Sequence, residues 1–441
     1  MSLIPSMRTS RIERVFRHWQ TFGVLTAFAV VVGATTVWSP LVAILIAAAV
    51  VLGLAWPLFR RTVRGANWAL PLLVALVSTL LFSGLASSSG PARYASTATV
   101  LAVVLAMRTR GARTGRALWV YAAVLCVYGL LGTILGRFFI GTENGAFPIV
   151  LPMLICLAGW APDEGNDTDL RLALKMVAFL GSIFALACAV VRLAELSDEL
   201  SVFSHEKSFL MILAVASAVA ARSRWLTVFS LVSVLFAFAT YPAATYVVGG
   251  LAALLTVVLL RWSPDQPTRM GLGLVGMATV LWATVHVDTL VRFTAPYFAL
   301  VGKADNGSTR AELYESALRQ LSGEPVFAHF FTSDLTLTAK LSGQGFVIPV
   351  HNDYLGVALS GGIVAAALLL SVFMSANGCA IQAVKACGIS STRGRAITAL
   401  LASINAAAVT AFANPVFMSP GSSMAVFAII FALVSLCVQG S

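Results

Sequence analysis

His351 is the residue of this chain best suited to acid–base chemistry. It precedes Asn352, Asp353 and Tyr354 at the start of a long apolar segment, and it follows the longest polar stretch, residues 292–350. Imidazole changes its charge near neutral pH, so a histidine at the mouth of an apolar helix could act as a general base. Asp353 could orient the imidazole or stabilise its protonated form through its opposite charge, and Asn352 could also orient it. The alternative is a polar helix cap, because Asn and Asp are favoured N-cap residues.

The polar stretch contains one predicted helix. Thr309 and Glu312 fit a Thr-x-x-Glu capping box, and Gly323 and Pro325 end the segment. The pattern predicts an amphipathic helix over 310–322 that lies on the membrane or over the helix bundle. Its apolar stripe recurs at helical spacing and consists of Leu313, Ala317, Leu318 and Leu321.

Four cations are candidates for binding an anion. Arg310 lies in the first turn of the predicted helix, where a cation opposes the helix dipole. This penalty suggests a compensating anion, and a side chain that reaches lipid headgroups is an equal alternative. Lys207, Arg292 and Arg137 lie at the outer ends of predicted spans, where cations are uncommon. Two or three of them together would suit a pyrophosphate, although each alone would be an ordinary interfacial charge.

These residues belong to a sequence with the composition of an integral membrane protein. It is 59% hydrophobic and 11% charged, whereas soluble domains carry about 25% charged residues. Since about 20 apolar residues cross a bilayer, the pattern predicts an all-α polytopic protein with about 12–14 transmembrane helices. Residues 1–441 form a single membrane domain, and residues 292–350 form one large extracytoplasmic loop. The apolar segments are 22–38, 41–59, 69–86, 94–107, 117–136, 147–161, 172–191, 208–221, 225–241, 243–260, 270–291, 360–382, 396–413 and 421–438.

Basic residues predict the orientation. If the N-terminus is cytoplasmic and the sides alternate, 20 of the 29 lysines and arginines are cytoplasmic, in agreement with the positive-inside rule. Both termini are then cytoplasmic. The net charge of +11 reflects this topology and an attraction to anionic lipid, and no basic domain points to nucleic acid. Neither a metal-ligand spacing nor a phosphate loop occurs, so we expect no metal and no cofactor.

The C-terminal third resembles the O-antigen ligase and polysaccharide polymerase family of bacterial membranes. His351, ten further residues and Gly362 are similar to the His-x10-Gly signature of that family. Arg310 is similar to the arginine that opens the family's loop helix, and Lys207 is similar to a basic residue that caps a span on the outer face. The family's Gly-x-Gly and Ser-Arg features are replaced here by residues 326–329 and 241–245.

The resemblance implies a metal-independent glycosyltransferase in the bacterial inner membrane. The donor would be a glycan on undecaprenyl pyrophosphate. The acceptor would be a sugar hydroxyl, either on another lipid-linked repeat unit, as in a surface-polysaccharide polymerase, or on lipid A core, as in an O-antigen ligase. The two missing features favour a polymerase slightly. His351 would be the base, and Arg310 and Lys207 would neutralise the leaving pyrophosphate.

A different class of function is also open. A multi-pass transporter or flippase of lipid-linked or anionic solutes would explain the many spans. Transporters usually place polar or ionisable residues at the bilayer midplane on broken helices, whereas the polar chemistry of this sequence is concentrated in the outer loop. We expect the Gly361-Gly362 pair to allow close packing between helices.

Overall fold

The computed structural model describes the C-terminal part of the chain and a few positions elsewhere. The described stretches are 167–193, 207–241, 243–262, 307–323, 337–341, 344–348, 351–412 and 420–438, with the isolated positions 72–73, 75–76, 268, 275, 326, 414 and 416–417. Arg137, Arg292 and the predicted spans 22–38, 41–59, 94–107, 117–136, 147–161 and 270–291 lie outside these residues, except for position 275.

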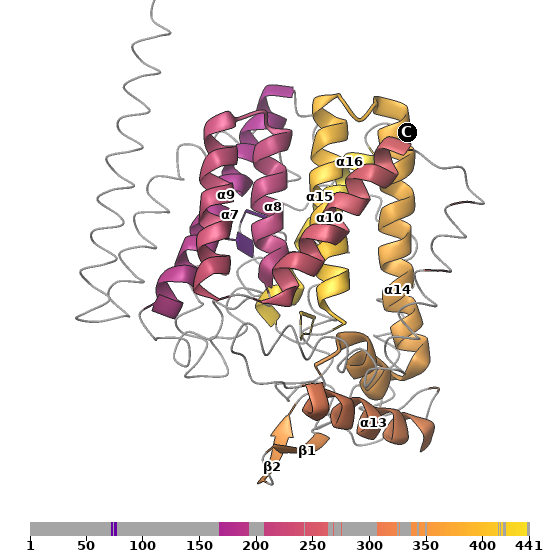
Figure 1. The fold of residues 1–441 in the computed structure, drawn as a ribbon. Coiled ribbons are helices and arrows are strands. Elements are labelled where there is room, and N and C mark those ends of the chain that lie inside the picture. The colour runs from indigo at the N-terminus through magenta and orange to yellow at the C-terminus, as the bar shows by residue number, and fades with distance from the viewer. Residues whose placement is uncertain are drawn as a thin grey trace, which may run out of the picture.

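The described part is a bundle of helices (Figure 1). Its first group is α7 (Asp167–Leu193), α8 (Ser208–Ala220) and α9 (Arg224–Thr240), which pack against one another. The second group is α14 (Asp353–Cys387), α15 (Thr392–Thr410) and α16 (Pro420–Val438). Helix α10 (Ala244–Trp262) crosses obliquely between the groups and contacts α8 and α15. Seven of the eight predicted apolar segments from 172–191 to 421–438 are therefore helices, and the eighth, 270–291, lies outside the described residues apart from position 275.

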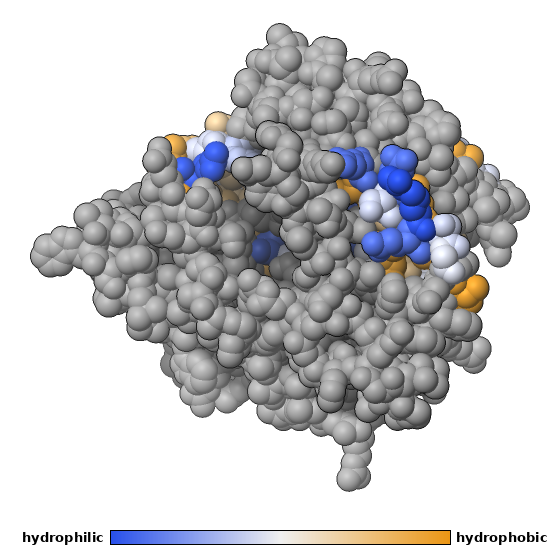
Figure 2. All heavy atoms as spheres, turned by 90° about the horizontal axis from the view of Figure 1, so that it is seen from below, coloured by the Kyte–Doolittle hydropathy of each residue, from blue (hydrophilic) through white to orange (hydrophobic). Residues whose placement is uncertain are grey.

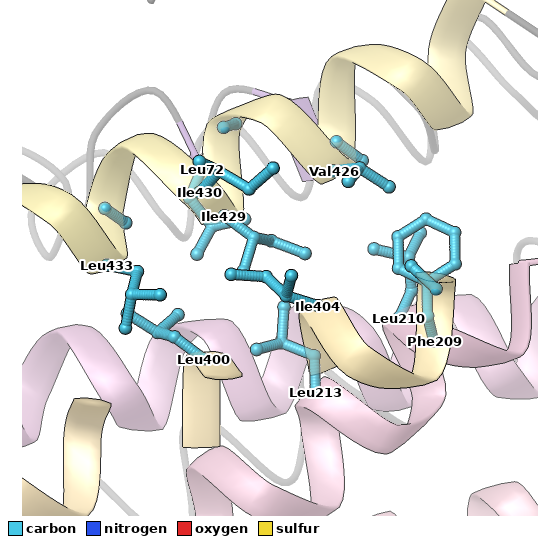
Figure 3. Close-up of a cluster of buried hydrophobic side chains, with 14 of the residues drawn as sticks. Leu72, Phe209, Leu210, Leu213, Leu400, Ile404, Val426, Ile429, Ile430 and Leu433 are labelled. Atoms are coloured by element: carbon cyan, nitrogen blue, oxygen red, sulfur yellow. The ribbon is translucent and has the colours of Figure 1, made fainter. Parts of the chain in front are cut away.

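Helix α15 lies at the centre of this bundle and packs against α7, α8, α10, α14 and α16. Its sequence is rich in alanine, whose small side chain lets neighbouring helices approach closely. Leu400 and Ile404 on α15 meet Phe209 and Leu213 on α8 and apolar residues of α16 such as Ile429 in a buried cluster (Figure 3). The central helix needs no lipid-facing stripe, because its neighbours surround it.

Polar groups join the helices inside the bundle. The side-chain amides of Asn377 on α14 and Asn405 on α15 bond reciprocally at 2.9 and 3.0 Å. Asn405 also donates to the Thr256 hydroxyl on α10 at 2.9 Å. On the other side of the bundle, the hydroxyls of Ser182 and Ser230 lie 2.8 Å apart and join α7 to α9. Each bond satisfies a group that would be costly to leave unpaired among apolar side chains.

Three helices of the described part are long and apolar enough to cross a bilayer: Asp167–Leu193, Ala244–Trp262 and Gly361–Cys387. Large apolar side chains are exposed along α9 and α10, for example Leu235 and Leu251. Contiguous exposed apolar surface of this kind marks contact with lipid or another apolar partner. Composition, helix length and surface together support association with a membrane.

Gly362 interrupts α14. Its backbone has φ 80° and ψ 171°, a region that is essentially restricted to glycine. The interruption separates a short first segment, starting at Asp353, from the long segment Gly361–Cys387. We expected the Gly361-Gly362 pair to serve helix packing. The structure gives Gly362 a backbone role, because an L side chain would be strained at this φ, and the packing role stays a prediction.

Two further elements lie beneath the bundle in Figure 1. Helix α13 (Gly307–Gly323) contains the predicted helix 310–322 but begins earlier, so Thr309 lies inside it and is not its N-cap. Strands β1 (Leu337–Leu341) and β2 (Gln344–Ile348) form an antiparallel hairpin in which Leu341 pairs with Gln344. We expected only loop and helix here. The overlooked signal is Ser-Gly at 342–343 between two short runs of β-forming character.

Candidate functional site

The helices alternate in direction, so their ends gather at two opposite ends of the bundle. The His351 end, at the bottom of Figure 1, holds the ends of helices at Leu193, Ser208, Thr240, Ala244, Asp353, Thr410 and Pro420. The arginine end, at the top, holds Asp167, Ala220, Arg224, Trp262, Cys387, Thr392 and Val438. Candidate residues from distant parts of the sequence meet at the His351 end.

His351 lies immediately before the first segment of α14 and is partly exposed. The following residue, Asn352, is buried, and its Oδ1 accepts the N–H of Leu355 at 3.1 Å. Asn352 is therefore the N-cap of α14, as the cap interpretation of the sequence predicts. The cap and the Tyr314 contact described below fix the backbone of His351 at the helix start. The orienting role of Asn352 and Asp353 toward this imidazole stays a prediction.

Asp353 is fully buried and joins the start of α14 to the segment between α15 and α16. Its backbone N–H donates to the carbonyl oxygen of Ala411 at 2.8 Å. Its carboxylate Oδ2 accepts the N–H of Phe417 at 2.6 Å. A buried carboxylate is costly unless hydrogen bonds compensate it, and these bonds fix the α14 start against the segment that connects α15 to α16. Spacing along the sequence suggested no such role, since Phe417 is 64 residues away.

Tyr314 joins α13 to this helix start. Its hydroxyl lies 3.0 Å from the carbonyl oxygen of His351 and 2.9 Å from that of Phe412, so its proton can bond to either. Beside it, Leu313 and Ala317 of α13 pack on Leu355 and Leu359 of α14 in a separate buried cluster. The stripe predicted on this helix thus covers the bundle end. The sequence analysis did not identify Tyr314 as a site residue, although it directly follows Leu313 of that stripe.

Arg310 lies in the first turns of α13, and this is the helix that Tyr314 fixes beside His351. The opposite face of α13 is hydrophilic and includes the exposed residues Glu315 and Arg319. Figure 2 shows this end of the molecule, where hydrophilic side chains gather on one side, over α13.

Lys207 is a buried cation at the same end. It immediately precedes α8, and only 3% of its surface is exposed. The neighbouring Ser208 hydroxyl donates to the carbonyl oxygen of Thr245 at 3.3 Å, which holds the start of α8 against α10. The Lys207 charge is close enough to act on the Cys188 thiol of α7. Burying an ammonium group is costly, so a buried lysine at a helix end is a candidate functional group.

A further cation lies nearby on the surface. The Arg192 guanidinium, in the last turn of α7, lies 4.8 Å from the centre of the Tyr241 ring, which follows α9. This cation–π contact ties two helix ends together.

No family model matches this sequence, and neither does any curated protein. Within the described residues, no group of three or more His, Cys, Asp or Glu side chains could hold a metal ion. The His351 end provides an imidazole, a buried ammonium group and a helix that carries an arginine. Together they could support proton transfer beside a stabilised anion.

Proposed function

We propose that this protein transfers a glycan from an undecaprenyl-pyrophosphate carrier to a sugar hydroxyl at the outer face of the bacterial inner membrane. The observation that carries the proposal is the bond from Tyr314 to the His351 carbonyl oxygen, 3.0 Å long. It ties the helix bearing Arg310 to the backbone of the candidate base. The resemblance to O-antigen ligases and polymerases supports the same assignment of roles.

The proposed reaction uses three residues. The His351 imidazole takes the proton of the acceptor hydroxyl, and the resulting oxygen attacks the anomeric carbon of the donor. The bond between that carbon and the pyrophosphate oxygen breaks as the new glycosidic bond forms. Arg310 and Lys207 balance the charge that develops on the departing pyrophosphate, with Arg292 and Arg137 as further candidates. The leaving group is activated by charge neutralisation, so the proposal includes no nucleotide or metal.

The orientation is part of the proposal. We infer that residues 292–350 face away from the cytoplasm and that both termini are cytoplasmic. Support comes from the position of Arg171, Arg222 and Arg395 at the end of the bundle opposite to His351, as the positive-inside rule requires. A topology reporter fused near Gln320 tests this. Activity of a reporter that works only in the cytoplasm would contradict the orientation.

The direct test is a transfer assay with the purified full-length protein. We expect it to consume a lipid-linked glycan and release undecaprenyl pyrophosphate only when an acceptor is present. Repeat-unit acceptors that give longer chains would identify a polymerase, which we favour slightly, and lipid A core acceptors would identify a ligase. Failure with both acceptors, under conditions in which the protein remains folded, would contradict the proposal.

Transport of a lipid-linked or anionic solute is the second candidate. The break of α14 at Gly362 favours it, because transporters place binding sites at broken helices. Against it, the half-buried amides of Asn377 and Asn405 bond to each other and do not require a solute. Vesicles containing labelled donor separate the two functions: a transporter moves the intact lipid-linked glycan between leaflets, whereas a transferase consumes it.

A further inference from the structure

Two arginines and a threonine form a linked group at the arginine end. Arg171 of α7 and Arg395 of α15 each place a guanidinium nitrogen 3.4 Å from the Thr392 hydroxyl oxygen. That hydroxyl donates to the carboxylate of Asp167 at 2.8 Å. Arg395 Nε also donates to the carbonyl oxygen of Ala220 at 2.9 Å. The two guanidinium groups are thus brought together by contacts between α7, α8 and α15.

A third arginine, Arg222, follows two residues after Ala220, whose carbonyl oxygen accepts from Arg395. The charges of Arg222 and Arg171 act on the Arg395 guanidinium, and the charge of Asp167 opposes them. Arg224 is exposed nearby in the chain, and Asp169 adds one more carboxylate. Among the described residues of this group, guanidinium charge therefore exceeds carboxylate charge. Such a surplus favours an anionic ligand.

Arg222 occupies a backbone conformation that arginine adopts at a cost. Its φ is 54°, and it is the one residue other than glycine with a positive φ in the described part of the chain. The backbone N–H of Arg222 donates to the carbonyl oxygen of Val219, and the N–H of Ser223 donates to that of Ala218. These two bonds end α8. Glycine is the usual residue at such a helix end. An exposed arginine in its place suggests that the charge serves a function.

The level of this end relative to lipid is indicated by tryptophan. Trp225, in the first turn of α9, is 49% exposed, and its ring packs against Phe229 at a centroid distance of 5.4 Å. Trp262, the last residue of α10, lies at the same end and is 64% exposed. Exposed tryptophans gather at the boundary between lipid tails and headgroups. The arginines next to Trp225 therefore lie at the level of lipid phosphates.

We propose that Arg171, Arg222 and Arg395 bind the phosphodiester group of an anionic phospholipid at the arginine end. The planar guanidinium offers paired N–H donors that match phosphate oxygens, and three of them from different helices would hold one headgroup. The bound lipid would bridge α7, the α8–α9 turn and α15. This site is separate from the His351 end, and it does not depend on glycan transfer.

The test compares lipid binding by variants of the full-length protein in detergent. Retained lipid is measured by native mass spectrometry, with phosphatidylglycerol as the anionic probe and phosphatidylcholine as the neutral control. We expect a preference for phosphatidylglycerol, and we expect Arg222→Gly to weaken its binding about fivefold, the usual contribution of one basic residue near an anionic surface. Glycine suits the φ of 54°, so this variant should remain folded.

The matched control is Arg261→Gln, which removes a charge from an exposed position at the end of α10. It should keep the affinity of the unmodified protein for phosphatidylglycerol. Equal binding of the two lipids, an Arg222→Gly variant with unchanged affinity, or an equal loss in Arg261→Gln would each overturn the site. Displacement of the lipid by millimolar inorganic phosphate would overturn the lipid assignment in favour of a free anion.

Discussion

The two ends of the bundle use polar residues in opposite ways. At the His351 end, Asn352, Asp353 and Lys207 are all at least 97% buried, and backbone groups engage the first two. At the arginine end, Arg171 and Arg222 are exposed. Burial fixes the position of a group and removes water from it, whereas exposure keeps a charge solvated and adaptable.

This difference separates two kinds of function. A group that transfers a proton or stabilises a developing charge must be held in place before the reaction occurs. A group that attracts lipid headgroups can bind in several geometries, because each contact is weak and solvent-screened. Substitutions at the His351 end should therefore have larger functional effects than substitutions at the arginine end.

The largest effect is expected for His351→Ala. Removing a general base typically lowers the rate about 10²–10⁴-fold, while the protein should still reach the membrane in normal amounts. The measurement is turnover of lipid-linked glycan at matched protein levels. Asn352→Ala is the control for the helix cap and should lower the free energy of unfolding by about 1 kcal/mol. Retention of more than about a tenth of the activity in His351→Ala would reduce His351 to part of the cap.

The second largest effect on activity is expected for substitutions of Arg310. If it stabilises the leaving pyrophosphate, Arg310→Ala should slow donor use about 10²-fold or more. Arg310→Lys should restore only part of this loss, because lysine lacks the planar fork that matches phosphate oxygens. Arg319→Ala on the exposed face of the same helix is the control, since its 3.6 Å contact with Glu315 is a surface ion pair of little energetic weight. Full activity with lysine would indicate lipid snorkelling instead.

Gly362→Ala tests whether the break in α14 is needed to present His351. Alanine at φ 80° and ψ 171° should cost about 1–3 kcal/mol. The variant should melt at a lower temperature, and activity should fall if the short first segment moves. Gly378→Ala in the same helix is the control, because a Cβ at that glycine meets nothing within 4 Å. Equal stability of the two variants would show that the backbone tolerates alanine at 362.

The smallest effect at this end is expected for Tyr314→Phe. The ring stays in place, and the lost hydroxyl should cost about 0.5–1.5 kcal/mol. Transfer should fall further than stability alone explains, since α13 loses its bond to the His351 carbonyl oxygen. Tyr354→Phe removes a comparable bond, 2.9 Å to Ala408, that does not involve α13. If both variants lose activity equally, Tyr314 has no particular role in holding the loop helix.

Local sequence patterns determined much of this molecule. Apolar segments such as 172–191 predicted helices, the stripe around Leu313 predicted α13, and Asn352 was recognisable as a helix cap. Each of these signals is contained within a few turns of chain, where helical periodicity and capping chemistry act. The hairpin signal at 342–343 was also local, and its interpretation as loop was wrong.

The tertiary structure decided which residues act together. Tyr314 reaches carbonyl oxygens 37 and 98 residues away, and Arg171 meets Thr392 across 221 residues. No spacing in a single sequence encodes such contacts, because they depend on how whole helices pack. The direction of the backbone at Gly362 is likewise set by where α14 must start beneath its neighbours. The sequence by itself named the candidate base and cations, and packing determined that His351 and the helix bearing Arg310 share one end.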